Sequence, residues 1–218
     1  MARPKKALLT PDLIVDAAMA LGDRHGNFTV TQLASALRVH PSSLYHHVTG
    51  REEVVDLMRA RIASTIDDSP VGVARWDEAF ERLAWSYRAA FAAHAGSIRL
   101  LATSRVRDSG TLAVYDRISA MLLDAGFPSS KIMPMIVAFD NFVIGSAFWV
   151  ADEPVDAYFE VDADMHRSLT RIVEDFEDEK TAAQVAFGLG LDALLQGFRV
   201  LLTREGTTPI TPEIEVAP

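Results

Sequence analysis

The 218-residue chain lacks cysteine altogether. Disulfide scaffolds, thiolate nucleophiles and cysteine-based zinc or iron–sulfur sites are therefore excluded, and the absence fits a reducing compartment. Sequence motifs for catalysis are missing too, because no G-x-S-x-G turn, H-E-x-x-H pair or EF-hand loop occurs. We therefore expect neither an enzyme nor a bound metal or other cofactor.

Long uninterrupted apolar runs are also absent. The longest candidate, residues 132–150, is interrupted by Pro134, Asp140 and Asn141, so it falls short of a membrane-spanning helix. The N-terminal residues lack the apolar core of a signal peptide. These absences predict a cytoplasmic protein that has no membrane partner.

Positive charge is scarce as well, since the formal net charge is −9, which at first argues against DNA binding. The distribution of charged residues along the chain changes that conclusion. Residues 1–60 hold seven Lys/Arg, six Asp/Glu and four of the six histidines, whereas residues 61–218 hold 14 Lys/Arg and 24 Asp/Glu. The N-terminal segment is thus far less acidic than the rest, and we expect its non-specific DNA affinity to be weak and salt-sensitive.

Residues 29–51 carry the most informative pattern, two short helices joined by a tight turn. Thr29 and Gln32 have the spacing of a capping box that starts the first helix. Residues 38–40 would form the turn, and Pro41 suits the first position of the second helix. This is the arrangement of a helix-turn-helix, whose second helix enters the major groove of DNA.

The second helix is rich in hydrogen-bonding side chains. Val39, Leu44 and Val48 are spaced to anchor it on a core. The side chains left pointing outward are those of Ser42, Ser43, Tyr45, His46 and His47. Surface helices ordinarily carry Glu, Lys and Arg, whereas hydroxyls and imidazoles suit contacts to bases and phosphates. An ordinary polar helix in a small bundle is the alternative.

The flanking residues extend this pattern. Thr10 is placed to cap a helix that Gly26 ends, and Thr49 and Glu52 have the spacing of another capping box at the start of a longer helix. The basic arm at residues 3–6 could follow phosphates or enter a minor groove, or it could be a solubilising tail.

The rest of the chain predicts helices with little strand signal, after a connection at residues 67–75. The expected helices are 76–94, 98–103, 110–124, 129–150, 165–176 and 181–202. The helix at 129–150 is apolar on nearly every side, so we expect one face to pack on a partner chain and the other to line a cavity. In the last helix, small residues form a stripe that lets another helix come close: Ala186, Gly190, Ala193 and Gly197.

The N-terminal residues resemble the tetracycline-repressor (TetR) family of transcriptional regulators. The resemblance rests on residues 13–20, 28–34 and 37–48, and most specifically on the element LYHHV at 44–48. It implies phosphate contacts from Thr29, Ser43, Tyr45, His47 and Arg51. It implies base-edge positions for Ser42, Ser43 and His46. Thr31 and Arg38 complete the predicted DNA-binding set. Arg38 stands where many members have glycine in the turn and adds a positive charge near the DNA.

The resemblance also implies an all-α architecture in two parts. Residues 1–50 would form a three-helix DNA-binding domain, 51–66 a connecting helix, 67–204 a larger ligand-binding and dimerisation domain, and 205–218 a flexible tail. The two unusual helices of the larger domain would form a four-helix bundle with their counterparts in a homodimer. The implied partners are double-stranded operator DNA, a small-molecule ligand and a second copy of the chain.

Members of this family usually hold their ligand inside the larger domain. The candidate lining residues are Trp85, Tyr87, Phe91, Leu101, Thr103, Met121, Met135, Phe139, Asn141 and Phe142. The alternative, that a side chain simply belongs to the core, applies to at least half of them. The positions that bind tetracycline and magnesium in the antibiotic repressor hold Asp67, Leu83 and about Leu100 here, so we expect a different ligand without a metal.

The sequence thus predicts a repressor that an apolar or amphipathic small molecule releases from its operator. A ligand-independent or activating regulator is one alternative. A small-molecule-binding protein with a vestigial DNA-binding part is another. An enzyme is a third, but no residues were found to support it.

Overall fold

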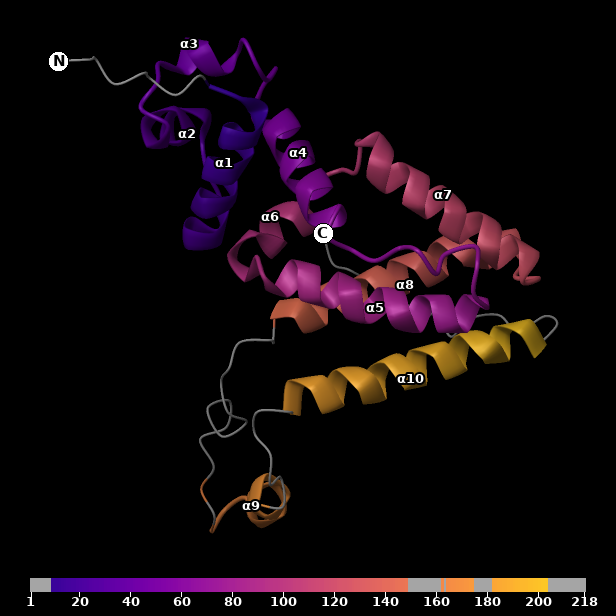
Figure 1. The fold of residues 1–218 in the computed structure, drawn as a ribbon. Helices are drawn as coiled ribbons and strands as arrows, with labels where there is room; N and C mark the ends of the chain where they lie inside the picture. The colour runs from indigo at the N-terminus through magenta and orange to yellow at the C-terminus, as the bar shows by residue number, and fades with distance from the viewer. Residues whose placement is uncertain (1–8, 149–161, 163, 175–181, 204–218) are drawn as a thin grey trace, which may run out of the picture.

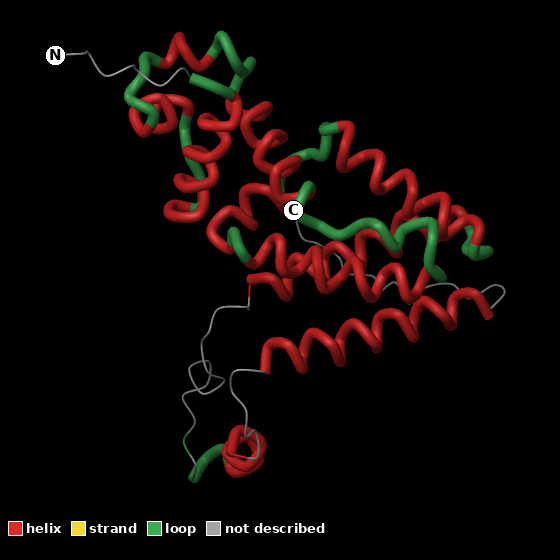
Figure 2. The backbone as a smooth tube through the Cα atoms, viewed as in Figure 1, coloured by secondary structure: helices red, strands yellow, loops and turns green. Residues whose placement is uncertain are grey.

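The computed structural model describes residues 9–148, 162, 164–174 and 182–203. These residues form helices and contain no strand (Figure 2), as expected from the sequence. In chain order the helices are α1 (Pro11–His25), α2 (Val30–Ala36), α3 (Pro41–Leu44), α4 (Arg51–Ala63), α5 (Trp76–Ala92), the 3-10 helix η1 (Ala95–Ser97), α6 (Ile98–Ala102), α7 (Ser109–Asp124), α8 (Ser129–Phe148), α9 (Arg167–Glu174) and α10 (Ala182–Thr203). The predicted arm at 3–6 and tail at 205–218 lie outside the described residues.

Capping side chains set the ends of the first helices, as predicted. The hydroxyl of Thr10 accepts the Leu13 amide at 3.3 Å, and α1 ends at Gly26 with a φ of 69°, a left-handed conformation that favours glycine. The Thr29 hydroxyl accepts the Gln32 amide at 3.2 Å, and Gln32 Oε1 accepts the Thr29 amide at 2.8 Å. Two amides that α2 leaves without partners are thereby satisfied.

The predicted capping box at the start of α4 involves a different carboxylate. Gly50, not Thr49, occupies the cap position. The residue that reaches back is therefore Glu53, whose Oε2 accepts the Thr49 amide at 2.6 Å and the Thr49 hydroxyl at 2.7 Å. Glu52 instead pairs with Arg107 at 2.6 Å. The assignment of Glu52 to the box was wrong by one residue.

We call α1–α3 the head and α5–α8 with α10 the body; α4 connects the two (Figure 1). The head does not have a closed core of its own. Its buried side chains, such as Leu33 and Leu44, belong to one cluster with Met58 of α4 and with Phe91 and Ile98 of the body. Movements of α4 or α6 must therefore disturb packing inside the head. The domain limits at residues 50, 66 and 204 stay predictions.

The body is a layered bundle in which α5, α8 and α10 lie alongside one another (Figure 1). Its core is rich in aromatic contacts, among them Phe80 against Phe139 with ring centroids 4.5 Å apart. Asp77 of α5 is 4% exposed and accepts hydrogen bonds from Arg75 at 2.5 Å and from Arg199 of α10 at 2.8 Å. These bonds lower the pKa of Asp77 to about 2, so a charged pair fastens α10 to α5.

Two body helices are long and apolar enough to cross a membrane, by length and composition alone. Residues 129–148 and 183–203 have mean hydropathies of 1.3 and 1.5. Both pack one face into the body core, through Phe139 and Val143 of α8 and through Phe187 and Leu191 of α10. A helix that is buried on one side and apolar on the other fits a protein interface as well as a bilayer.

Candidate functional site

The helix-turn-helix presents its polar side chains as the sequence predicts. Leu44 is fully buried and Val48 is 4% exposed, so these two anchor α3 on the head core. The other predicted side chains of this segment lie outside that core. Those of Thr29, Thr31, Arg38, Ser42, Tyr45, His46 and His47 are exposed, and those of Ser43 and Arg51 are half-buried. The head thus carries a surface of hydroxyl, imidazole and guanidinium groups.

The second helix is shorter than predicted. Only Pro41–Leu44 is α-helical, and residues 45–47 continue as a turn. The amides of His47 and Val48 both donate to the Leu44 carbonyl, at 2.8 and 3.0 Å. This tightening of the last turn brings Val48 into the core. His40, which we placed in the connecting turn, is the cap of α3, and its Nδ1 accepts the Ser42 amide at 3.3 Å.

The turn between α2 and α3 contains a strained residue. Arg38 has a φ of 55°, which makes it the one residue other than glycine with positive φ in the described part of the chain. The left-handed conformation costs a residue with a Cβ roughly 1–2 kcal/mol. The backbone conformation of Arg38 therefore lowers the stability of the head, while its side chain places a positive charge beside α3.

Arg51 has structural partners within the chain. Its Nε donates to the Phe28 carbonyl at 2.9 Å, and its guanidinium lies 5.3 Å from the Phe28 ring centroid. Another nitrogen donates to Asn27 at 2.5 Å. Arg51 thus fastens the start of α4 to the segment before α2, and its phosphate contact stays a prediction.

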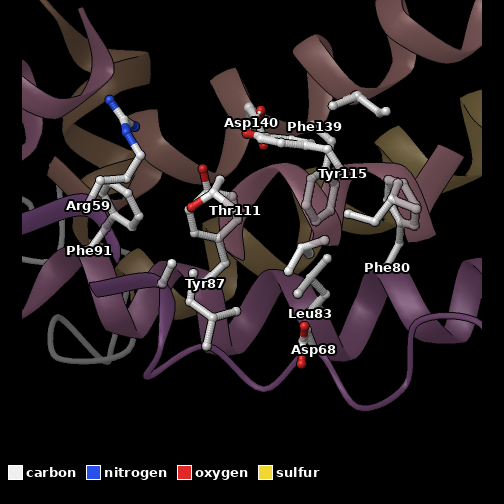
Figure 3. Close-up of a pocket in the computed structure, with 15 residues that line it drawn as sticks. Arg59, Asp68, Phe80, Leu83, Tyr87, Phe91, Thr111, Tyr115, Phe139 and Asp140 are labelled. Atoms are coloured by element: carbon white, nitrogen blue, oxygen red, sulfur yellow. Dashed lines mark hydrogen bonds between the residues drawn. The ribbon is translucent and has the colours of Figure 1, made fainter. Parts of the chain in front are cut away.

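The body contains a cavity of about 70 Å³ between α4, α5, α7 and α8 (Figure 3). Its lining joins an apolar part to a polar part, and most of it comes from positions the sequence does not single out. The lining residues are Arg59, Ala63, Ile66, Asp68, Phe80, Leu83, Tyr87, Phe91, Thr111, Val114, Tyr115, Ile118, Ile136, Phe139 and Asp140. The lining therefore suits an amphipathic molecule.

Three of the predicted pocket residues, Tyr87, Phe91 and Phe139, line this cavity. The others lie elsewhere in the structure. Leu101, Met121 and Met135 are buried in the core, Trp85 and Phe142 pack on Phe187 of α10, and Asn141 is exposed. Thr103 lies in a second, more polar groove of about 860 Å³ between head and body, together with Arg99 and Arg105.

The polar part of the cavity is built around a buried carboxyl group. The Tyr115 hydroxyl donates to Asp140 Oδ2 at 2.7 Å. Burial raises the pKa of Asp140 to about 6, because a charged carboxylate loses solvation there. Burial also raises the pKa values of Tyr87 and Tyr115, so both hydroxyls keep their protons at neutral pH. The polar part of the cavity therefore holds two protonated hydroxyls and one titratable carboxyl group.

Arg59 connects the cavity to α6. It lies on α4, is 7% exposed, and donates from one nitrogen to the Leu101 carbonyl at 2.5 Å and to the Ser104 hydroxyl at 2.5 Å. Sequence reasoning missed it, because an arginine on an amphipathic helix is ordinarily exposed to solvent. Its burial becomes visible only once α6 and α7 are packed on α4.

The small-residue stripe of α10 is divided between two environments. A Cβ on Gly190 would lie 2.6 Å from Phe142 Cε2 of α8 in the same chain, so a larger residue here would require the Phe142 ring to shift. Within the chain the helix that approaches Gly190 is α8, and the predicted dimer contact of Gly190 stays a prediction. Ala186, Ala193 and Gly197 are exposed, and a Cβ on Gly197 would touch nothing within 4 Å.

Comparison with known proteins gives a consistent assignment. A family model, the tetracyclin repressor-like C-terminal domain, matches residues 70–202. The tetracycline repressor protein class E of Escherichia coli is 25% identical over 212 residues, 94% of this chain and 97% of that protein. An HTH-type transcriptional regulator of Saccharopolyspora erythraea is 30% identical over 143 residues, 65% of this chain and 61% of that protein.

A solved structure agrees with the observed architecture. The Streptomyces coelicolor TetR family protein ActR in complex with actinorhodin superposes with a TM-score of 0.68 at 24% identity, covering 92% of this chain and 98% of that one. Since the family model covers the body and the Escherichia coli repressor aligns along head and body alike, the chain belongs to the tetracycline-repressor family of transcriptional regulators.

Proposed function

We propose that the protein is a homodimeric repressor in the cytoplasm, and that it leaves its operator when a small amphipathic molecule enters the body cavity. The observation that carries this proposal is that one helix, α4, connects the DNA-binding head to the body cavity. α4 begins beside the helix-turn-helix, at Arg51, and lines the cavity further along, at Arg59 and Ala63. A ligand in the cavity therefore contacts the element that positions the head.

Binding to DNA is supported by the chemistry of the head surface. Tyr45, which is 56% exposed, and Arg38 are suited to phosphate contacts, and Ser42 and His46 to base edges. The acidic body makes strong non-specific adsorption to DNA unfavourable. Affinity should therefore depend on a matched operator and on two heads acting together.

Control by a ligand is supported by the cavity and by relatives whose names include ligands, namely a tetracycline repressor and ActR with actinorhodin. Tetracycline itself fits poorly here. Leu83 contributes an apolar side chain to the lining, whereas Asp67 lies on the surface beside Arg82 at 3.7 Å. The ligand of this chain is therefore expected to be a different molecule, bound without a metal.

Dimerisation is supported by the outer faces of α8 and α10. Met133 and Val137 of α8 are 62% and 48% exposed, and Val185 and Leu189 of α10 are 56% and 72% exposed. The two helices are packed together through Phe142 and Phe187, whose rings stack 5.2 Å apart. Apolar rows on neighbouring helices are the surface that a four-helix bundle between two copies would bury.

Operator selection followed by a Tyr45→Phe comparison tests the DNA-binding proposal. Genomic fragments retained by the purified protein should share a two-fold symmetric sequence. Tyr45→Phe should weaken binding to all variants of that sequence about equally, by roughly 1 kcal/mol for one lost hydrogen bond. His46→Ala should instead change the relative affinities for base-substituted operators. A changed base preference in Tyr45→Phe with unchanged affinity for the original operator would show that the roles are misassigned.

A further inference from the structure

We propose that the cavity recognises a small aromatic molecule through a hydrogen-bond acceptor oxygen, such as a carbonyl or carboxylate, bound by Arg59 and Thr111. We further propose that Arg59 transmits this contact to the head through α6. This inference rests on the proposed ligand-controlled function and adds to it the chemical class of the ligand and the residue that senses it.

The lining holds polar atoms that have no partner. Arg59 Nε and Thr111 Oγ1 are buried and form no hydrogen bond, and both residues line the cavity. A buried donor without an acceptor is costly, and such groups are rare in folded proteins. An acceptor oxygen that enters between α4 and α7 would offer Arg59 Nε or the Thr111 hydroxyl the partner that each of them lacks.

The acidic groups of the lining are already paired. Asp140 accepts from the Tyr115 hydroxyl, and Asp68 forms an ion pair with Arg117. Each acidic group of the lining thus has at least one partner, whereas Arg59 Nε and the Thr111 hydroxyl have none. This balance favours a ligand that accepts hydrogen bonds over a cationic ligand that donates them.

The rest of the lining suits a flat apolar group. Phe80, Leu83 and Phe139 form the part of the cavity away from Arg59 (Figure 3), and aromatic side chains pack well against an aromatic ring. A cavity of about 70 Å³ is small, so an entering molecule must displace side chains. Displacement is cheapest where no hydrogen bond is broken, and Thr111 is such a place.

Arg59 contacts both the cavity and the end of α6. While its Nε has no acceptor, its other nitrogen binds the Leu101 carbonyl and Ser104 at the end of α6. A ligand that draws the guanidinium toward the cavity competes with these bonds. The position of α6 thereby becomes sensitive to the ligand.

The other end of this segment is fastened to the head. The Ser97 hydroxyl donates to Asp23 of α1 at 2.6 Å, and His94 Nδ1 lies 2.9 Å from the same carboxylate. The backbones approach so closely that a Cβ on Gly96 would lie 2.0 Å from the Asp23 carbonyl oxygen. Because residues 96–97 are packed this tightly on Asp23, they cannot slide along α1. A shift of α6, which follows them directly, must therefore move α1 with it.

Four probes of matched size test the ligand class on the full-length protein: acetophenone, benzoate, cumene and 1-phenylethylamine. Dissociation constants are measured by calorimetry or ligand-observed NMR without DNA. We expect Thr111→Val to weaken acetophenone and benzoate by about fivefold, the value of one hydrogen bond, and to leave cumene unchanged. Arg59→Lys, which keeps the charge but loses Nε, should weaken both acceptors by about tenfold.

Thr111→Val is the decisive variant, because it removes an unpaired hydroxyl and should fold at least as well as the wild type. Thr103→Val, an exposed threonine outside the cavity, is the matched control and should change no dissociation constant. Equal weakening of cumene and acetophenone, preference for 1-phenylethylamine, or no binding of either acceptor probe would overturn the assignment.

Measuring release from the operator distinguishes a failure of this inference from a failure of the proposed ligand-controlled function. Acetophenone at saturating concentration should release the wild type from its operator but release Ser97→Ala less, although both bind the probe equally. Operator binding that persists with every probe bound would contradict the ligand-controlled function while the acceptor chemistry stands. Normal release by cumene with no benefit from an acceptor oxygen would contradict the role of Arg59 alone.

Discussion

Replacing Asp140 with asparagine is expected to stabilise the folded protein by roughly 2–3 kcal/mol at pH 8. The folded pKa of this carboxyl is about 6 against an ordinary value of 3.8, and each unit of difference corresponds to about 1.4 kcal/mol. Asparagine carries no charge to desolvate, and its carbonyl oxygen can still accept from Tyr115. The cost of burying a carboxylate is thereby removed.

The pH dependence of this effect has a definite sign. The folded state binds the Asp140 proton more tightly than the unfolded state, so the wild type loses stability as pH rises from about 4 to about 6. The difference between variant and wild type should grow over that interval and stay level above it. Urea unfolding at pH 4, 5 and 8, at one protein concentration, measures it. Asp116→Asn, at an exposed position of α7, should stay within about 0.5 kcal/mol of the wild type, and an equal result for Asp140→Asn would show that the carboxyl is not buried at a cost.

Leu189→Lys is expected to convert the protein into folded monomers that bind the operator weakly. Leu189 is 72% exposed within the chain, so the lysine disturbs no intrachain packing. In a two-fold dimer it would bury an uncompensated charge on each of two symmetry-related surfaces, at a cost of several kcal/mol. Operator affinity should fall by roughly 10²–10⁴, because the second head no longer binds as part of the same molecule.

Light scattering and operator titration together check this result. Val73→Lys is the matched control, because Val73 is 86% exposed and lies in the connection before α5. It should remain a dimer with unchanged operator affinity. If Leu189→Lys stays dimeric and binds normally, the interface lies elsewhere. Gly190→Glu does not serve this purpose, since Gly190 packs on Phe142 and its loss would disrupt the chain itself.

Local signals predicted the helices well because their causes are local. A threonine oxygen reaches an amide three residues away whatever the rest of the chain does, so Thr10 and Thr29 reliably marked helix starts. The same logic failed at Glu52, because the cap fell on Gly50 and shifted the box by one residue. The capping role of His40 was missed because imidazole is not an ordinary cap.

Most of the cavity lining could not be predicted from the sequence, because its residues meet only through packing. Arg59, Thr111 and Asp140 come from α4, α7 and α8. Leu101, Met121 and Met135 have the same apolar character as true lining residues, and only the assembled bundle places them in the core. The glycine at 190 signalled a close approach correctly but could not say which helix approaches.

The salt dependence of operator binding tests the central claim most directly. The selected operator and a scrambled duplex of equal length are titrated by fluorescence anisotropy at 50 and 200 mM salt. A dimer whose two heads make about 6–10 phosphate contacts should lose roughly three to five decades of affinity between these concentrations, and at both it should favour the operator over the scrambled duplex. Affinity that does not change with salt, or equal binding of the two duplexes, would contradict the assignment of the head as a sequence-specific DNA-binding surface.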